Sequence, residues 1–327
     1  MPVPASNPSP GDYPARGATG IAMTQPNDLQ LRFLLPAAGV RGVAVRLDDT
    51  WQAMAERAPY PPAVAELLGE AAAASALFTG HAKVDGRLSV QLRASGALRT
   101  LFAECTAAGT LRGIARLDEG ALDGSLPPPS RDLRALGDDA VLAITIENPA
   151  LGGREPIRYQ GLVALDADRL DAAFEDYFRQ SEQLPTRLLL ACDGHRAAGL
   201  MLQKLPGDEG DEDGFRRIGA LFDTLGDEEL LAVPSAELIH RLFHEESPQL
   251  LGEKPLRFAW SCSRERVGAM LVSLGEDEAR AAVASGGDGQ AHVHCEFCGR
   301  EYRYDADQVA ALFRQAAAEL PAPPGLQ

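Results

Sequence analysis

Three cysteines near the C-terminal end constrain this chain more than any other feature. Cys295 and Cys298 form a Cys-x-x-Cys pair followed by Gly299, and Cys262 lies upstream of them. Two thiolates at this spacing on a tight turn can bind one metal ion, and the glycine allows a positive φ there. Cys262 can supply a third ligand, but a closed tetrahedral zinc site needs a fourth. Two residues before Cys262 stands Trp260, whose indole offers only an N–H donor.

The fourth ligand has several candidates. His294 directly precedes Cys295, and His292 shares the face of His294 if residues 291–294 form a strand, because side chains two apart in a strand point the same way. A neutral imidazole is a good zinc ligand. A water molecule or a group from elsewhere in the chain can also complete the site, and a chain that lacks a fourth ligand need not hold zinc stably. The sequence leaves these alternatives open.

The same residues resemble the C-terminal zinc switch of the Hsp33 family of redox-regulated chaperones. The resemblance rests on the segment Cys262–Arg266 and, after a spacer, on Cys295–Gly299. Three more blocks look like Hsp33 segments, namely residues 41–51, 180–188 and 197–206, so that the resemblance runs from about residue 29 to 315. In the family the first half of the switch is Cys-x-Cys. Trp260 therefore stands where one of four zinc ligands would be.

The resemblance implies an ATP-independent holdase chaperone, which binds unfolding proteins under oxidative stress and prevents their aggregation. It implies one weakly held Zn²⁺ per chain, with Cys262, Cys295 and Cys298 as ligands and His294 or His292 as the candidate fourth. Oxidation would join Cys295 to Cys298 in a disulfide bond, release the zinc and unfold the linker. Cys262 would remain as an odd thiol. The active form would be a homodimer made through the N-terminal domain.

Two alternatives stay open beside this function. In the first, the protein is a holdase that has lost its redox control, so that its chaperone activity is constitutive or is released by heat. A zinc-dependent hydrolase is an alternative from another class, since three protein ligands and a water are typical of a catalytic zinc. The zinc deaminase pattern H-x-E with P-C-x-x-C is absent, however, because residues 292–294 read His-Val-His and histidine, not proline, precedes Cys295. We therefore expect a chaperone and not an enzyme.

The composition limits the partners and the compartment. A net charge of −16 and a pI near 4.8 argue against a nucleic-acid partner, because no surplus of cations is available to neutralise phosphates. We expect no apolar run long enough to span a membrane, and the N-terminal segment lacks the apolar stretch of a signal peptide. Cysteines with ligand spacing indicate a reducing cytoplasm, and Cys105 and Cys192 are interpreted as ordinary half-buried thiols. No glycine-rich phosphate loop indicates a nucleotide.

The order of the predicted elements indicates an α+β fold. A disordered extension (1–28) precedes a chaperone core domain that has a mixed or antiparallel sheet and packed helices (29–206). An acidic loop and helical linker layer (207–255) leads to a small zinc-binding redox-switch domain (256–316) and a flexible tail (317–327).

Hydrophobic periodicity predicts the elements of these parts. Strands are expected at 31–35, 43–47, 87–92, 98–105, 111–116, 141–146, 159–163, 187–191, 197–203, 258–261 and 291–294. Helices are expected after a cap formed by Asp48, Asp49 and Thr50, at 63–81, 168–183, 214–246 and 265–274, and after a capping box at 273–276. The strands between 87 and 116 would form an antiparallel meander, and the alanine-rich helix 63–81 would pack inside the domain.

Overall fold

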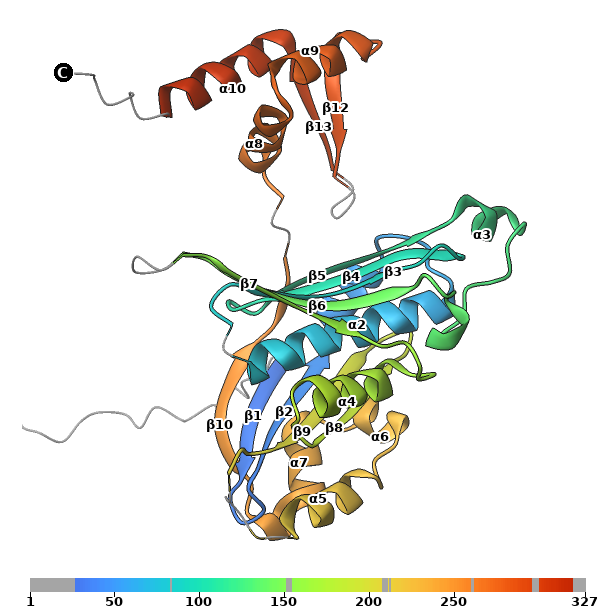
Figure 1. The fold of residues 1–327 in the computed structure, drawn as a ribbon, viewed down its shortest axis with the longest axis vertical. Coiled ribbons are helices and arrows are strands. Elements are labelled where there is room, and N and C mark those ends of the chain that lie inside the picture. The colour runs from blue at the N-terminus through green and yellow to red at the C-terminus, as the bar shows by residue number, and fades with distance from the viewer. Residues whose placement is uncertain are drawn as a thin grey trace, which may run out of the picture.

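The computed structural model describes residues 27–82, 84–150, 155–207, 211, 213–259, 262–295 and 300–319 (Figure 1). These residues form a core with two sheets, a layer of short helices against one of them, and a small C-terminal unit beyond the other. The α+β prediction is confirmed. All but the last two residues of the predicted N-terminal extension, and most of the predicted tail, lie outside the described residues.

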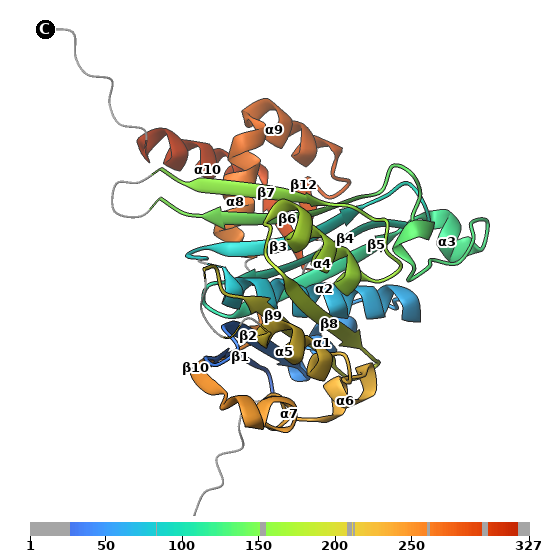
Figure 2. The ribbon, with the colours of Figure 1, turned by 60° about the horizontal axis from the view of Figure 1, so that its bottom comes forward.

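Two antiparallel sheets make up the core (Figures 1 and 2). The five-stranded sheet has the order β10-β1-β2-β9-β8, with β1 (Leu29–Leu35), β2 (Val40–Leu47), β8 (Thr186–Cys192), β9 (Ala197–Lys204) and β10 (Gln249–Pro255). The six-stranded sheet has the order β11-β5-β4-β3-β6-β7, with β3 (Arg87–Arg93), β4 (Leu98–Thr106), β5 (Thr110–Leu117), β6 (Val141–Asn148), β7 (Ile157–Val163) and β11 (Arg257–Phe258). Its centre is the predicted meander, and only β11 runs parallel to its neighbour.

Helix α2 (Pro62–His81) lies between the two sheets and contacts strands of both. Fourteen of its twenty residues are buried, and its run of alanines lets both sheets approach the helix backbone closely. The expectation that this helix packs inside the domain is confirmed. By length and composition alone it could also cross a membrane, contrary to our expectation from the sequence, but its burial between the sheets accounts for its apolar composition.

Shorter helices complete the core. They are α1 (Asp49–Ala55), α3 (Glu119–Asp123), the 3₁₀ turn η1 (Leu133–Ala135) and α4 (Leu170–Ser181). Helix α4 packs beside α2 against β8 and β7, as its apolar stripe predicts. Gly161 on β7 makes this contact possible, because a Cβ atom there would lie 2.1 Å from the hydroxyl of Tyr177 on α4.

A helical layer, α5 (Gly214–Phe222), α6 (Asp227–Ala232), α7 (Ser235–Phe243) and η2 (His244–Glu246), covers the outer face of the five-stranded sheet. The two surfaces share one apolar core, whose buried members on the layer are Ile218, Phe222, Leu225, Leu230, Leu238, Ile239 and Phe243. Phe243 stacks on Phe33 of β1, with 6.2 Å between the ring centroids. The layer is therefore packed as part of the domain.

The C-terminal unit consists of α8 (Arg264–Leu274), α9 (Glu276–Ser285), β12 (Gln290–His294), β13 (Glu301–Asp305) and α10 (Ala306–Glu319). Strands β12 and β13 form an antiparallel pair. Among the described residues, the helices and the pair enclose a core of seven buried residues, Leu271, Ala279, Val283, Ala291, Tyr302, Tyr304 and Val309. So small a core gives this unit little stability of its own.

Two predicted helix caps are wrong. The carboxylate of Asp48 binds Arg46 at 3.1 Å and accepts no capping hydrogen bond from α1. Instead, Asp28 accepts hydrogen bonds at the start of α1 from the backbone N–H groups of Asp48 (2.5 Å) and Thr50 (2.6 Å). The predicted capping box at 273–276 also fails, because α9 begins after Gly275 and no side chain caps it.

Strand β10 was not predicted, and β11 overlaps a predicted strand at one residue. β10 lies at the end of the predicted linker and pairs with β1 along its length, from Leu29 opposite Pro255 to Leu34 opposite Gln249. β11 covers only the first residue of the strand predicted at 258–261, and residues 260 and 261 lie outside the described residues. The chain thus passes from the helical layer to the C-terminal unit through one strand of each sheet.

Candidate metal and redox site

Two of the predicted ligands stand at the ends of regular elements in the C-terminal unit. Cys262 directly precedes Ser263, the N-cap of α8, whose side-chain oxygen accepts a hydrogen bond from the N–H of Arg266 at 3.3 Å. Cys295 directly follows β12, and its N–H donates to the carbonyl of Arg300 at 2.8 Å. This bond extends the β12–β13 pairing by one residue, so that both cysteines are held by ordered backbone.

The fold brings these two cysteines into contact, with 2.9 Å between the Sγ atoms of Cys262 and Cys295. Both side chains are partly buried against the small core of the unit. Zinc bonds to sulfur are about 2.3 Å long, so two thiolates on one tetrahedral ion stand roughly 3.8 Å apart. A shift of less than about 1 Å would therefore let both sulfurs bind one ion, and the pair fits a zinc site in position and chemistry.

The two candidate histidines are not brought to the sulfur pair. His292 is bound on both ring nitrogens, with Nδ1 2.5 Å from Glu301 and Nε2 2.9 Å from Asp288. These two carboxylates raise the pKa of His292. His294 is exposed and lies on the opposite strand face from Val293 and Cys295, which pack toward the core. Either histidine would have to move to become the fourth ligand.

The other residues of the predicted site, Cys298 and Trp260, lie outside the described residues. Within the described part of the chain, no three histidine, cysteine or acidic side chains are grouped so as to hold a metal ion. The ligand set and the Cys295–Cys298 disulfide bond therefore stay predictions, supported by the position of Cys262 and Cys295.

Arg264, which the sequence reasoning did not single out, fastens the start of α8 to the β12–β13 pair. Its guanidinium lies 4.3 Å from the ring centroid of Tyr304 and donates to the carbonyl of Arg303 and to Gln308, both at 2.9 Å. The hydroxyl of Tyr304 in turn donates to the carbonyl of Arg264 at 2.7 Å. Because these partners are about forty residues apart in sequence, no local pattern could have indicated them.

The two remaining cysteines belong to the main core. Cys105 on β4 and Cys192 on β8 are buried, more deeply than the half-buried state expected from the sequence. Burial raises the pKa of the Cys105 thiol to about 12, and it raises the pKa of Cys192 as well. Since the thiolate is the reactive form, both are poor targets for oxidants in the folded protein.

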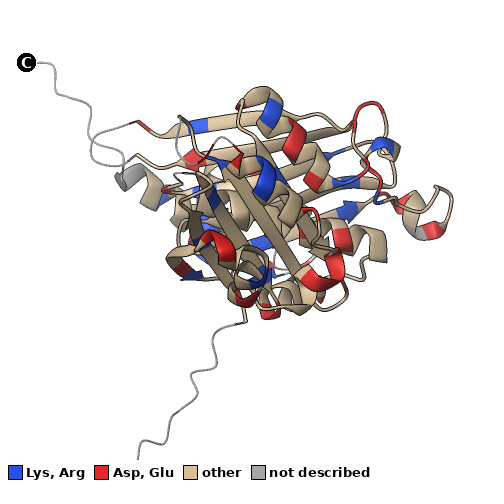
Figure 3. Ribbon diagram, turned by 90° about the horizontal axis from the view of Figure 1, so that it is seen from below, with Lys and Arg blue, Asp and Glu red and all other residues tan. Residues whose placement is uncertain are grey.

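Two arginines attach the helical layer to the core at α6. Arg169 binds both carboxylate oxygens of Asp227, at 3.1 and 3.3 Å. Arg46 donates to the carbonyls of Leu231 (3.0 Å) and Val233 (3.3 Å). These short polar contacts supplement the apolar packing under the layer. Acidic and basic residues are interspersed on the face of the molecule that Figure 3 shows.

Comparison with known proteins identifies the family. A family model described as Hsp33 protein matches residues 28–305, which is most of the chain. The chain belongs to the Hsp33 family. An Hsp33 relative from Ectopseudomonas mendocina (strain ymp), named 33 kDa chaperonin, is 43% identical over 300 residues, covering 90% of this chain and 98% of the relative. A 33 kDa chaperonin from Pseudomonas fluorescens (strain Pf0-1) is 40% identical over 299 residues, with 90% and 96% covered.

A solved Hsp33 structure has the same fold. The crystal structure of the 33 kDa chaperonin (heat shock protein 33 homolog) from Thermotoga maritima aligns with a TM-score of 0.69 at 18% identity, over 90% of this chain and 100% of that one. The family membership inferred from the cysteine segment and the three other blocks is confirmed. The relatives are named as chaperonins, which supports a chaperone function and agrees with the prediction that the chain is not an enzyme.

Proposed function

We propose that this Hsp33 family member is an ATP-independent holdase, which binds unfolding proteins in the cytoplasm and becomes active when its C-terminal cysteines are oxidised. The apolar face under the helical layer supports this most directly. The outer face of the five-stranded sheet carries the buried side chains of Leu31, Phe33 and Leu35 from β1 and Leu200 and Leu202 from β9. Removal of the layer would expose this surface, and a contiguous exposed apolar surface binds unfolded chains.

The chain connects the helical layer directly to the cysteines, so that in the proposed switch a change at the cysteines can act on the layer. The chain runs from α7 through β10 and β11 directly to Cys262. Among the described residues β10 pairs with β1 alone, and β11 is two residues long. Unfolding of the C-terminal unit would therefore act directly on an edge strand of each sheet, and β10 adjoins the layer.

Zinc, when bound, would cross-link the start of α8 to the segment after β12 and hold the thiolates reduced. Cys262, Cys295 and Cys298 would hold it, with a histidine as the candidate fourth ligand. For a unit with seven buried core residues, the free energy of metal binding contributes directly to folding. Loss of the cross-link would leave the unit dependent on that core alone.

Oxidation would remove the ligands in two steps. A peroxide molecule oxidises one thiolate of the Cys295 and Cys298 pair to a sulfenic acid and is itself reduced to water. The second thiol attacks the sulfenic sulfur and releases a second water, which leaves the Cys295–Cys298 disulfide bond. Cys262 takes no part in this disulfide bond. We propose that the active form is a homodimer that binds clients on surface the layer releases.

The first measurement is the zinc content of the reduced protein, followed by zinc release and suppression of client aggregation as peroxide is added. The proposed switch predicts close to one zinc per chain, released in step with the gain of holdase activity. Cys298→Ser should abolish activation by peroxide, because it removes one half of the disulfide bond. Cys262→Ser keeps that pair but removes a ligand, so it should bind less zinc and respond at lower peroxide.

Two outcomes would contradict the redox switch. A Cys298→Ser protein that responds to peroxide like the wild type would show that this pair does not control activity. Little zinc, together with activity before any oxidant is added, would favour a holdase that is constitutive or released by heat.

A further inference from the structure

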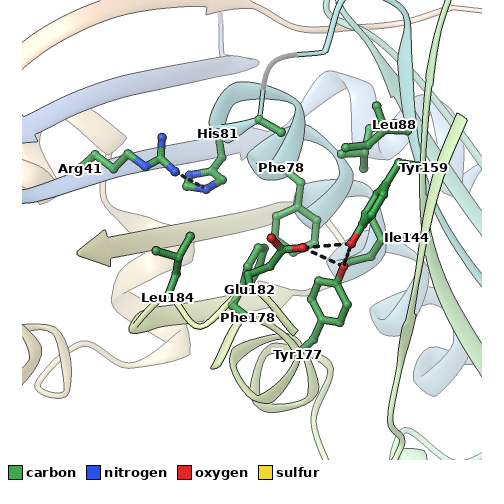
Figure 4. A pocket seen from close by; sticks show the side chains of 12 residues that line it. Arg41, Phe78, His81, Leu88, Ile144, Tyr159, Tyr177, Phe178, Glu182 and Leu184 are labelled. Atoms are coloured by element: carbon green, nitrogen blue, oxygen red, sulfur yellow. Dashed lines mark hydrogen bonds between the residues drawn. The ribbon is translucent and has the colours of Figure 1, made fainter. Parts of the chain in front are cut away.

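A cavity of about 420 Å³ lies between the two sheets, at the C-terminal end of α2 (Figure 4). Its walls come from both sheets and from α2 and α4, and their apolar side chains are Phe78, Leu88, Ile144, Ile146, Phe178 and Leu184. Small-molecule sites in proteins are mostly apolar hollows of roughly 300–1,000 Å³ in which a few polar groups orient the ligand. The volume and the walls of this cavity therefore fit a small ligand.

Arg41 of β2 is one of the polar groups that line this cavity. It shares a strand face with Val43 and Val45, which belong to the core between the sheets, so its side chain lies on the inner face of the five-stranded sheet. Its Nη2 donates to Oε1 of Gln203 at 2.6 Å and lies 2.9 Å from Nε2 of His81. Its Nε is buried without a hydrogen-bond partner among the described residues, and its Nη1 has no acceptor among them either. The guanidinium thus keeps donors that the described chain does not use.

The positive charge of Arg41 is not balanced by a carboxylate. Among the described residues no acidic side chain forms an ion pair with it, and its hydrogen-bond partners are the neutral Gln203 and His81. Because Arg41 can only donate, Nε2 of His81 accepts, and burial and Arg41 lower the pKa of this ring to about 3. Burial lowers the pKa of Arg41 too, although a guanidinium stays protonated. A half-buried cation without a counter-ion is unfavourable, and a ligand that brings an anion would relieve this.

The carboxylate of Glu182, which also lines the cavity, is engaged by two tyrosines. The hydroxyls of Tyr159 and Tyr177 lie 3.0 and 3.3 Å from it and 3.0 Å from each other. Figure 4 shows this group apart from the pair of Arg41 and His81. Glu182 would repel a second negative charge on a ligand. The cavity is therefore suited to a ligand with a single anionic group beside Arg41 and an apolar remainder.

We infer that this cavity binds an amphipathic monocarboxylate, such as a medium-chain fatty acid, whose carboxylate pairs with Arg41 and whose apolar chain lies between the sheets. A carboxylate matches the planar fork of a guanidinium, which can donate two parallel hydrogen bonds to it. A phosphate dianion would call for a second cation, and the uncharged ring of His81 supplies none. The net charge of −16 disfavours non-specific binding of anions, so the affinity must come from this local site.

This site is separate from the surface proposed for clients. The apolar walls of the cavity belong to the core between the sheets, whereas the helical layer covers the outer face of the five-stranded sheet. Binding of the ligand therefore needs neither release of the layer nor oxidation of the cysteines. The inference goes beyond the proposed chaperone function and can fail without it.

The test is isothermal titration calorimetry of the reduced full-length protein with octanoate and with octanamide, which has the same chain but no charge. We expect octanoate to bind at one saturable site per chain. Octanamide should bind at least tenfold more weakly, because only the carboxylate forms a charge-assisted pair with Arg41. This comparison uses the wild type alone, so it stands even where a substitution impairs folding.

Two variants locate the ligand. Arg41→Gln keeps a donor but removes the charge, so it should weaken octanoate binding at least tenfold and abolish the preference for octanoate over octanamide. Ala82→Trp should weaken binding of both ligands by filling the cavity, since Ala82 lines it with φ −85° and ψ 161°, an extended conformation that any side chain can adopt. The matched control is Arg32→Gln on the neighbouring strand β1, where the side chain is exposed and lies outside the cavity lining. It should bind octanoate within twofold of the wild type.

The results that would overturn the inference are distinct. A wild type without saturable octanoate binding would show that the cavity takes no such ligand. Equal affinity for octanoate and octanamide, or an equal loss in Arg41→Gln and Arg32→Gln, would show that Arg41 does not recognise the carboxylate. Octanoate binding that Ala82→Trp leaves unchanged would place the ligand outside the cavity. None of these results bears on the chaperone function, which zinc release and suppression of aggregation test separately.

Discussion

Glu70 lies on α2 in the middle of the core, where its side chain is 3% exposed. Its carboxylate is bound by the guanidinium of Arg131, which also binds Glu66 at 3.0 Å. Burial raises the pKa of Glu70 to about 7, and Arg131 only partly offsets this. The folded protein therefore binds a proton here more tightly than the unfolded chain does.

This shift predicts how stability depends on pH. For an acid whose folded pKa is raised from 4.5 to about 7, the contribution to stability is complete below pH 4.5 and is lost as pH rises through 7. Glu70→Gln removes the titration, so its free energy of unfolding relative to the wild type should shift by about 2–3 kcal/mol in favour of the variant between pH 5 and 8. Urea unfolding of both proteins at pH 5 and at pH 8 measures this shift in the free energy of unfolding. A constant difference would show that Glu70 does not titrate in that range.

The position of Asp28 shows why some single-residue predictions fail. The sequence predicted Asp48 as the cap of α1 because it precedes the helix, but Asp28 takes that role from the start of β1. It also accepts a hydrogen bond from the hydroxyl of Thr50. A partner twenty residues away is placed by the pairing of β1 with β2 and not by local sequence. Local capping rules cannot identify such a partner.

At the scale of elements, α6 is attached to the core by an arginine–carboxylate pair. Arg169 is itself positioned by Asp171, which it binds at 2.7 Å, and it reaches across to Asp227 at the first turn of α6. A carboxylate there is also favoured by the helix dipole. The pair therefore holds α6 against α4 and β8.

Weakening this pair should loosen α6 selectively. Asp227→Asn removes the charge, which for a partly exposed pair costs up to about 1 kcal/mol. We expect hydrogen exchange of the α6 amides to be about threefold to fivefold faster, with little change in β4. Asp223→Asn is the matched control, because Asp223 meets Arg187 at 3.5 Å and both are well exposed. Equal effects of the two variants would show that Asp227 has no special role in holding the layer.

The elements with strong periodicity were predicted well, and those defined by distant pairing were not. Helices 63–81 and 168–183 and the meander between 87 and 116 appear where the sequence indicates them. β10 was missed because the apolar and polar residues of its sequence, Gln-Leu-Leu-Gly-Glu-Lys-Pro, alternate poorly and five of the seven residues are exposed. It is a strand only because β1 lies beside it. The contact between Cys262 and Cys295 was anticipated from the resemblance, whereas the engagement of His292 by two carboxylates was not.

For the whole molecule, the five cysteines divide between the buried core and the C-terminal unit. Peroxide added to the folded protein should therefore modify only Cys262, Cys295 and Cys298, since the raised pKa values of Cys105 and Cys192 keep those two as buried thiols. Mass spectrometry after alkylation checks this, with guanidinium-unfolded protein as the control in which all five react. Oxidation of Cys105 at a rate like that of Cys295 in folded protein would contradict it.

The pairing of β1 with β10 has a consequence for biosynthesis. One edge of β1 stays unpaired until β10 has been synthesised. β10 begins at Gln249, which is made long after Leu35. At roughly 5–20 residues per second, the ribosome needs on the order of ten seconds or more to synthesise the intervening chain. During that time the nascent chain displays Leu31, Phe33 and Leu35 uncovered, because the helices that bury them are also still to come. This member of a chaperone family is thus itself exposed to aggregation each time it is made.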